Sequence, residues 1–264
     1  MRFANKVVWL TGASSGIGEA LAYAFAREGA RLVLSSRRPA ELERVRRACE
    51  RAGEHLVVAL DLKCSEAFPT IAANVLTHAG HVDVLVNNGG VSQRALAAKA
   101  TLDVERALME VDYFGPVALT KAVLPSMLAR RAGHVVVVSS VMGYLGTPGR
   151  STYAAAKHAL HGYFDSLRAE VWPHGVQVTL ACPGYVRTAI AQNAVGPTGE
   201  AHERESEAAR GIPAARCAAA IIRGVARKRE EFYVGGWEVA GIYLKRFAPG
   251  LLSRIVRRMK FSVR

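Results

Sequence analysis

The feature that most restricts the fold of this chain is a glycine-rich turn near its beginning. The apolar run Lys6–Leu10 predicts a buried strand, and a helical pattern, Glu19–Gly29, follows the turn Thr11–Gly18. At such a junction the free backbone N–H groups and the positive helix end form a cradle for an anion, and glycine lets the backbone approach it. A plain strand-to-helix turn is the alternative. We expect a pyrophosphate to be held by Gly12, Ser14, Ser15, Gly16, Ile17 and Gly18.

The end of the second predicted strand indicates the type of nucleotide. Arg31–Ser35 is followed by Ser36, Arg37 and Arg38, with no acidic residue. In dinucleotide sites an acid at this point binds the ribose hydroxyls, whereas an arginine accommodates a 2′-phosphate. Arg37, with Arg38 beside it, therefore favours NADP(H). The alternative is that both arginines only solvate the start of a helix.

A second stretch, Ser139–Lys157, supplies groups that can move a proton. It begins where an apolar strand ends, crosses a Gly/Pro-rich loop and enters a helical pattern. Tyr153 and Lys157 are four residues apart, so their side chains project from one face of the helix, and Ser140 lies at the strand end. A hydroxyl, a phenol and an ammonium can together move a proton on or off a substrate oxygen. Taken alone, a Tyr-x-x-x-Lys pair also occurs on ordinary solvated helices.

Short apolar strands alternate with helical patterns along the chain, which predicts a parallel sheet with helices on both faces. Further strands are expected at His55–Leu60, Val82–Val86, Gly133–Ser139, Val176–Ala181 and Glu231–Val234. Further helices are expected at Pro39–Ala52, Ser65–Ala79, Thr101–Arg130, Ser151–Trp172 and Pro213–Lys228. The helix Thr101–Arg130 should have two segments, of which the second, Val117–Leu128, is apolar on most faces and should be buried.

Length and composition fit one sizeable α/β domain, with 264 residues of which 50% are hydrophobic. The first residues lack the charged segment and long apolar run of a signal peptide, and no run approaches the roughly 18–20 apolar residues of a membrane span. The four cysteines are scattered and no histidines stand at metal-binding spacing. We therefore expect reduced thiols, no metal and a cytoplasmic protein.

The positive charge is concentrated in the tail. The chain has a net charge of +13, and from Gly241 to the C-terminus there are seven basic residues and no acidic one. This distribution argues against nucleic-acid binding by the whole surface and for a local role of the tail. After Pro249, apolar residues recur on one face of a helix. Residues 249–261 should either contact a membrane surface or pack on their own or a partner subunit.

Taken in order, the motifs resemble those of the short-chain dehydrogenase/reductase family over roughly residues 4–235. The matching residues are Thr11, Gly12, Gly16, Ile17, Gly18, Asp61, Leu62, Asn87, Asn88, Gly89, Ser140, Tyr153, Lys157, Pro183 and Gly184. The resemblance implies an α/β fold of Rossmann type, a doubly wound sheet of about seven parallel strands with helices on both faces. Residues 1–235 would then form the NADP-binding and catalytic domain, and 236–264 a basic amphipathic extension.

The resemblance also implies roles for individual residues. Asp61 would contact the adenine, Asn88 would lie along the cofactor, and Thr188 with the backbone near Val186 would hold the nicotinamide carboxamide. Further cofactor contacts would come from Leu62, Pro183, Gly184, Tyr153 and Lys157. The family usually forms dimers or tetramers through helices that correspond to Val117–Leu128 and Ser151–Trp172, so a homodimer or homotetramer is expected.

The expected reaction is the NADP(H)-dependent interconversion of a carbonyl and a secondary alcohol. A free phenol holds its proton too tightly for efficient exchange at neutral pH, and a nearby ammonium favours the phenolate. Tyr153 would be the acid in reduction and the base in oxidation, with Lys157 tuning it and binding the nicotinamide ribose, as in the family. Ser140 would bind the substrate oxygen and stabilise its developing charge. A non-catalytic NADP(H)-sensing or scaffold protein on the same fold is the alternative.

Two positions depart from the family pattern. The fourth catalytic position, usually an Asn at the kink of the helix after the fourth strand, is Asp112 here, and Gly89 replaces an Ala. Asp112 could hold a relay water to Lys157, could weaken the effect of Lys157 on Tyr153, or could be protonated or structural.

The sequence indicates the substrate only broadly. Tyr144 and Tyr185, with Leu145 and Leu96, suggest an apolar pocket and hence an apolar or lipid-like small molecule. The segment 189–211 is polar and rich in Gly and Glu, and is either a lid over the site or a disordered loop.

Overall fold

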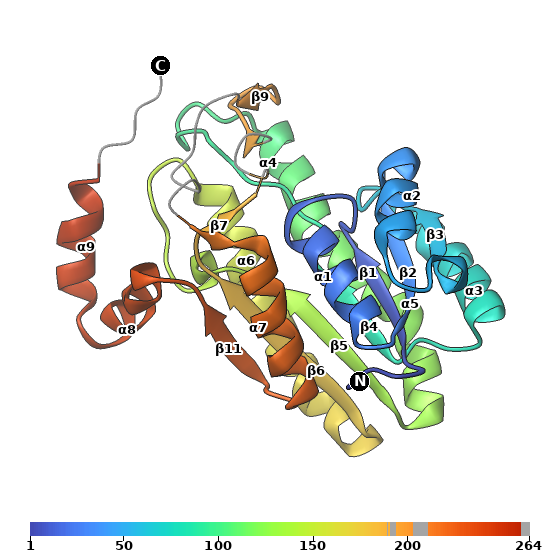
Figure 1. The fold of residues 1–264 in the computed structure, drawn as a ribbon. Coiled ribbons are helices and arrows are strands. Elements are labelled where there is room, and N and C mark those ends of the chain that lie inside the picture. The colour runs from blue at the N-terminus through green and yellow to red at the C-terminus, as the bar shows by residue number, and fades with distance from the viewer. Residues whose placement is uncertain (189, 191–193, 203–210, 260–264) are drawn as a thin grey trace.

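A single parallel sheet organises the computed structural model, which describes residues 1–188, 190, 194–202 and 211–259 (Figure 1). Its seven strands have the order β11-β6-β5-β4-β1-β2-β3. In chain order they are β1 (Val7–Thr11), β2 (Arg31–Ser36), β3 (Leu56–Ala59), β4 (Val84–Asn87), β5 (Gly133–Val138), β6 (Val176–Pro183) and β11 (Glu231–Val234). The strand order reverses between β1 and β4, and in doubly wound sheets this is the point at which ligands bind. The predicted fold class is confirmed.

Helices cover both faces of the sheet, and strand side chains alternate between the two cores. On β5, Val136 and Val138 pack with one core, and Val135 and Val137 with the other. The first core is covered by α1 (Gly16–Arg27), α2 (Pro39–Ala48) and α7 (Ala214–Ala226). The second is covered by α3 (Phe68–Ala79), α5 (Gly115–Arg130) and α6 (Ser151–Val171). Because both faces are covered, the strands need apolar residues at nearly every position.

Shorter elements connect these layers and extend the chain beyond the sheet. The helices are α4 (Leu102–Met109), α8 (Ala240–Phe247) and α9 (Pro249–Arg257), and a π-helical turn, η3, spans Glu110–Phe114. Single-turn 3₁₀ helices are η1 (Ala52–Glu54), η2 (Ser65–Ala67), η4 (Val141–Gly143), η5 (Trp172–His174) and η7 (Trp237–Val239). Two-residue strands are β7 (Val186–Arg187), β8 (Ala194–Val195), β9 (Ala201–His202) and β10 (Ile212–Pro213).

Two helix predictions need correction. The helix expected to reach Ala52 ends at Ala48, and a separate 3₁₀ turn follows. The segment Val117–Leu128 is buried on only one side, because α5 forms a single layer over the sheet. Its residues Lys121 and Pro125 are exposed, whereas Ala122 and Leu124 are half-buried and pack against the second core.

The predicted lid, 189–211, falls largely outside the described residues. Its described part contributes β8 and β9, which pair with each other. The predicted tail helix is present as α9. Within the described part of the chain, no helix combines the length and the apolar character that crossing a membrane requires.

Candidate active site

A cleft of about 440 Å³ lies at the carboxyl ends of the strands, where the strand order reverses. Its lining includes all the residues for which the sequence predicted cofactor contacts. These are Gly12, Ser14, Ser15, Gly16, Ile17, Gly18, Arg37, Asp61, Leu62, Asn88, Tyr153, Lys157, Pro183, Gly184, Val186 and Thr188. The cleft therefore begins at the amino end of α1 and ends at Tyr153 and Lys157.

Two glycines of the turn before α1 permit a fit that other residues would block. Gly12 has φ +65°, and a Cβ added there would lie 2.8 Å from the Cα of Gly89. A Cβ at Gly18 would lie 2.1 Å from the carbonyl oxygen of Gly12. The backbone of the turn is thus packed directly on the amino end of α1 and on the loop after β4, and its N–H groups can reach a phosphate.

Thr11, which matches the family motif but was given no role from the sequence, joins this turn to the loop after β4. The hydroxyl of Thr11 accepts from the backbone N–H of Asn88 and of Gly89, each at 3.0 Å. The side-chain amide of Asn88 donates to the carbonyl oxygen of Thr11 at 3.1 Å. The motif gives the position of Thr11, and the structure shows which groups it bonds.

Arg37 and Arg38 line the cleft from the end of β2 and are both exposed. The guanidinium of Arg38 donates to the hydroxyl of Ser14 at 3.2 Å, so a cation and a hydroxyl lie together beside the glycine-rich turn. Guanidinium groups bind phosphate oxygens with charge-assisted hydrogen bonds. The cleft thus has the groups to hold a dinucleotide with an additional phosphate.

Ser140 and Tyr153 line both this cleft and a second cavity, so they lie where the two meet. Ser140 lies two residues after β5, at the start of η4, and its hydroxyl accepts from the N–H of Met142 at 3.2 Å. Tyr153 is on the first turn of α6, where the side-chain oxygen of Gln93 accepts from the N–H groups of Thr152 and Tyr153 at 2.9 and 3.2 Å. Gln93 is fully buried and was not selected from the sequence. It satisfies two of the N–H groups that a helix leaves free at its start.

Asp112 and Lys157 form a buried ion pair in the lining of the cleft, with Oδ2 and Nζ 3.3 Å apart. Asp112 is on the π-helical turn, and its Oδ1 accepts from the N–H of Val91 at 2.7 Å. Burial raises the pKa of the Asp112 carboxyl, although Lys157 opposes that effect. Burial disfavours the Lys157 ammonium, but Asp112 and Tyr153 outweigh it and raise the pKa of Lys157. The Lys157 ammonium also lies 5.5 Å from the centroid of the Tyr153 ring.

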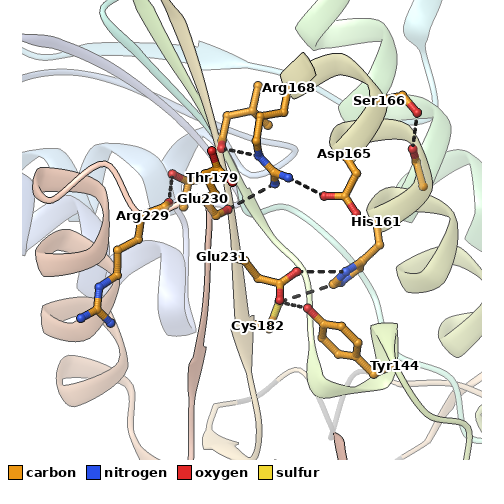
Figure 2. A network of polar contacts seen from close by, with 12 residues as sticks. Tyr144, His161, Asp165, Ser166, Arg168, Thr179, Cys182, Arg229, Glu230 and Glu231 are labelled. Carbon is orange, nitrogen blue, oxygen red and sulfur yellow. Dashed lines mark hydrogen bonds and ion pairs between the residues drawn. The ribbon is translucent and has the colours of Figure 1, made fainter. Parts of the chain in front are cut away.

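A polar network lies behind the end of β5 and includes Tyr144, which had been predicted to contact substrate (Figure 2). The hydroxyl of Ser139 shares a 2.9 Å hydrogen bond with Nε2 of His161, whose Nδ1 is 3.8 Å from Glu231. Tyr144 stacks edge-on against His161 and directs its hydroxyl at the sulfur of Cys182, 3.8 Å away. Burial is the main reason that the pKa of His161 is lowered.

Tyr144 is consequently absent from the described lining of both cavities, and we correct its predicted role to a structural one. It directly follows the one-turn helix η4, and a sequence pattern does not specify which way a side chain points there. Leu96 also lies outside the cavity lining, whereas Tyr185 and Leu145 belong to it.

The second cavity has a volume of about 770 Å³ and is mostly apolar. One wall is formed by Val141, Met142 and Leu145, which follow β5. The opposite wall is formed by the C-terminal helices, chiefly through Leu244, Leu252, Ile255 and Val256. Near Tyr153 the lining becomes polar, and the guanidinium of Arg150 lies 6.0 Å from the ring of Tyr153. An apolar molecule with one polar reacting group fits this distribution.

Comparison with known proteins identifies the family. The family model for the short chain dehydrogenases matches residues 6–197. The chain belongs to the short-chain dehydrogenase family. A Drosophila melanogaster protein named dehydrogenase/reductase SDR family protein 7-like is 41% identical over 261 residues, 96% of this chain and 80% of the relative. The Mus musculus dehydrogenase/reductase SDR family member 7B is 40% identical with the same coverage.

Solved structures of other short-chain dehydrogenases share the fold. One from Streptomyces avermitilis has a TM-score of 0.82 and 30% identity, covering 98% of this chain and all of that one. A metagenomic short-chain oxidoreductase in complex with NADP has a TM-score of 0.72 and 30% identity, covering 89% of this chain and 98% of that one. An alcohol dehydrogenase from Thermococcus sibiricus complexed with 5-hydroxy-NADP has a TM-score of 0.76 and 27% identity, covering 88% and 97%. Membership of this family makes the protein an oxidoreductase that uses a nicotinamide cofactor and acts on a small molecule.

Proposed function

We propose that this short-chain dehydrogenase uses NADP(H) to interconvert a carbonyl and a secondary alcohol on an apolar, lipid-like small molecule. The observation that carries the proposal is the position of Ser140 and Tyr153, which line both the nucleotide cleft and the apolar cavity. A substrate oxygen held by these two hydroxyls would lie at the junction of the two spaces.

The proposed chemistry assigns one task to each side chain. NADP(H), when bound, supplies or accepts the hydride. Ser140 donates a hydrogen bond to the substrate oxygen and stabilises its developing charge. Tyr153 gives a proton to that oxygen in reduction and removes it in oxidation. Lys157, kept charged by Asp112, favours the tyrosine phenolate and is placed to bind a ribose hydroxyl.

The choice of NADP(H) is supported by charge at the end of β2. Arg37 and Arg38 line the cleft there, and Ser14 adds a hydroxyl donor. Two of the similar solved structures are described as holding NADP or 5-hydroxy-NADP. An acid that would select the unphosphorylated ribose is absent from Ser35–Arg38.

A non-catalytic nucleotide sensor is less well supported. The one feature that favours it is Asp112, which replaces the Asn usual in the family. That carboxylate, however, forms an ion pair with the catalytic candidate Lys157. Such a protein also has no need of a hydroxyl and a phenol at the entrance of a large apolar cavity.

Assembly and location are further parts of the proposal. We infer a homodimer or homotetramer through α5 and α6, as is usual in the family, and the outer side of α5 is exposed at Lys121, Pro125 and Ala129. The cysteines of the described chain are free thiols, which fits a reducing compartment such as the cytoplasm. We place the catalytic domain at residues 1–235, with 236–264 as an extension.

The test is a cofactor-oxidation assay with the purified full chain. NADPH absorbance would be followed with short, medium and long aliphatic ketones and with cyclic ketones, and NADP⁺ reduction with the corresponding alcohols. We expect turnover that rises with apolar length and is weaker with NADH. Tight NADPH binding with no turnover of any ketone or alcohol would instead support the non-catalytic alternative.

A further inference from the structure

The C-terminal helices carry an apolar surface at the mouth of the second cavity. Five large apolar residues between Trp237 and Met259 are both exposed and part of the cavity lining: Trp237, Tyr243, Phe247, Ile255 and Met259. We call this set the apolar rim. Trp237 is 82% exposed, Phe247 80% and Ile255 47%, so large side chains that line the cavity also face solvent. Exposed apolar patches of this kind mark interaction sites.

The helix α9 stands away from the body of the molecule, beyond α8 at the β11 edge (Figure 1). None of its residues is buried, and Leu252 is its link to the small core around Tyr153 and Leu145. Leu251, Ile255 and Met259 follow one another at four-residue spacing and remain exposed. Packing on the protein's own body therefore accounts for only part of the apolar face of α9.

Basic residues flank the apolar rim. Lys245, Arg246, Arg254, Arg257 and Arg258 are all exposed, and we call this set the basic flank. On a helix that turns about 100° per residue, Arg254 and Arg258 lie on the stripe next to Leu251 and Ile255. Within the described residues none of the five forms an ion pair with the protein. The nearby acid Glu238 is engaged by the N–H groups of Tyr185 and Gly236.

We propose that α8 and α9 dock on an anionic lipid surface and that the cavity opens into that surface. Aromatic and aliphatic side chains flanked by cations are the composition of helices that lie in a membrane interface. The nine residues of α9 are far fewer than the roughly 20 that span a bilayer, so the contact is interfacial. A second copy of this chain is a poorer occupant, because two basic flanks would face each other.

Docking on lipid would account for the two properties of the apolar rim, which lines the cavity and is also exposed. An apolar substrate dissolved in lipid could pass between Phe247 and Ile255 toward Tyr153 without crossing water. This step rests on the proposed function, since it takes the cavity to be the substrate site. The docking itself does not, because it depends only on the surface of α8 and α9.

The first experiment measures sedimentation of the full chain with vesicles of phosphatidylcholine, with or without phosphatidylglycerol. We expect binding only to the anionic vesicles, with loss at high salt. The triple variant Arg254→Glu, Arg257→Glu, Arg258→Glu should bind at least about 100-fold more weakly, since each basic residue contributes near the surface. Its matched control reverses three exposed arginines of α7 and its C-cap (Arg216→Glu, Arg223→Glu, Arg227→Glu) and should bind almost as wild type.

Three results would overturn the docking. Wild-type protein that stays in the supernatant with anionic vesicles, equal losses in the two triple variants, or a change of oligomeric state in the α9 variant alone would each do so. The last result would assign the surface to a second copy.

A second measurement separates docking from catalysis. Turnover of a water-soluble ketone without vesicles should be unchanged in the α9 variant, whereas turnover of a long-chain ketone held in anionic vesicles should fall with its binding. Tyr153→Phe should sediment as wild type and turn over neither substrate. If Tyr153→Phe retained activity, the proposed function would fail while the docking stood.

Discussion

At the scale of single residues, the proposed preference for NADP(H) rests on two exposed cations. Arg37 and Arg38 line the cleft at the end of β2, and a phosphate–guanidinium hydrogen bond contributes about 1.5–3 kcal/mol. We predict that Arg37→Ala lowers the NADPH/NADH ratio of kcat/KM by about one to two decades, and that Arg38→Ala does the same. Arg47→Ala, on the exposed part of α2, is the control. An unchanged ratio in both cleft variants would refute the assignment of NADP(H).

Two substitutions of Asp112 separate the effect of its negative charge from the effect of its hydrogen bonds. Asp112→Asn restores the residue usual in the family and keeps an acceptor for Val91 or Lys157, so kcat should be retained or rise. Asp112→Leu leaves the Lys157 charge buried without its partner, which should destabilise the fold by about 3–5 kcal/mol. Steady-state kinetics and urea unfolding measure the two effects. Loss of most of kcat in Asp112→Asn would mean that the carboxylate has a catalytic role of its own.

The sequence predicted the residues of the site better than their contacts. The spacing of Tyr153 and Lys157 follows from helix geometry, and both lie in the cleft as expected. The bond from Gln93 to the start of α6 joins residues 59 and 60 positions apart, which no local pattern encodes. Tyr144 was misassigned because an aromatic in a loop can face either a cavity or the core.

At the scale of elements, the start of α6 depends on Gln93. Gln93→Ala would leave the N–H groups of Thr152 and Tyr153 buried and without a partner, at about 1–3 kcal/mol each. We predict a lower free energy of unfolding by about 2–5 kcal/mol and a lower kcat, because Tyr153 loses its anchor.

The comparison for this prediction is Thr77→Ala, which removes an exposed side-chain hydrogen bond from α3. Thr77→Ala should change neither the free energy of unfolding nor kcat appreciably. Stability and kcat of Gln93→Ala that match those of Thr77→Ala would show that α6 is positioned by its packing alone.

Elements whose apolar pattern is continuous were predicted well, and isolated ones poorly. The strands of the sheet are mostly apolar because both faces are covered, so their existence and order along the chain were clear. The amphipathic pattern of α9 predicted a helix, but an apolar face does not specify its neighbour. That α8 and α9 form a wall of the cavity required the three-dimensional arrangement.

At the scale of the whole molecule, a buried histidine makes stability depend on pH. His134 on β5 is bonded to Thr179 at 2.7 Å, and burial lowers its pKa to about 4. The unfolded chain, with a histidine pKa of about 6.5, binds a proton in the window between these values that the folded chain does not. Stability should therefore fall as the pH decreases through this window, by about 2 kcal/mol between about pH 7 and about pH 5.

Urea unfolding of wild type and His134→Gln at the two pH values measures this contribution. The variant should lose less stability on acidification than the wild type, by about the same 2 kcal/mol. Equal losses in the two proteins would place the acid sensitivity in other groups.

The whole-molecule fold was predictable because several motifs agree in order and spacing. A glycine-rich turn, an Asn-Asn-Gly at the end of β4 and the Tyr153–Lys157 pair have one common solution, the doubly wound sheet of the short-chain dehydrogenases. Substrate size was less predictable, because the cavity lies between segments more than 90 residues apart, such as Val141 and Ile255.

In the proposed function, Tyr153 transfers a proton to or from the substrate, whereas the affinity for NADP(H) depends little on its hydroxyl. The most direct measurement compares Tyr153→Phe with wild type for NADPH affinity, by fluorescence titration, and for kcat with the best ketone. Loss of a general acid should lower kcat by at least about 100-fold, while the NADPH dissociation constant changes by less than about tenfold. A Tyr153→Phe variant that keeps near wild-type kcat while binding NADPH normally would contradict the account.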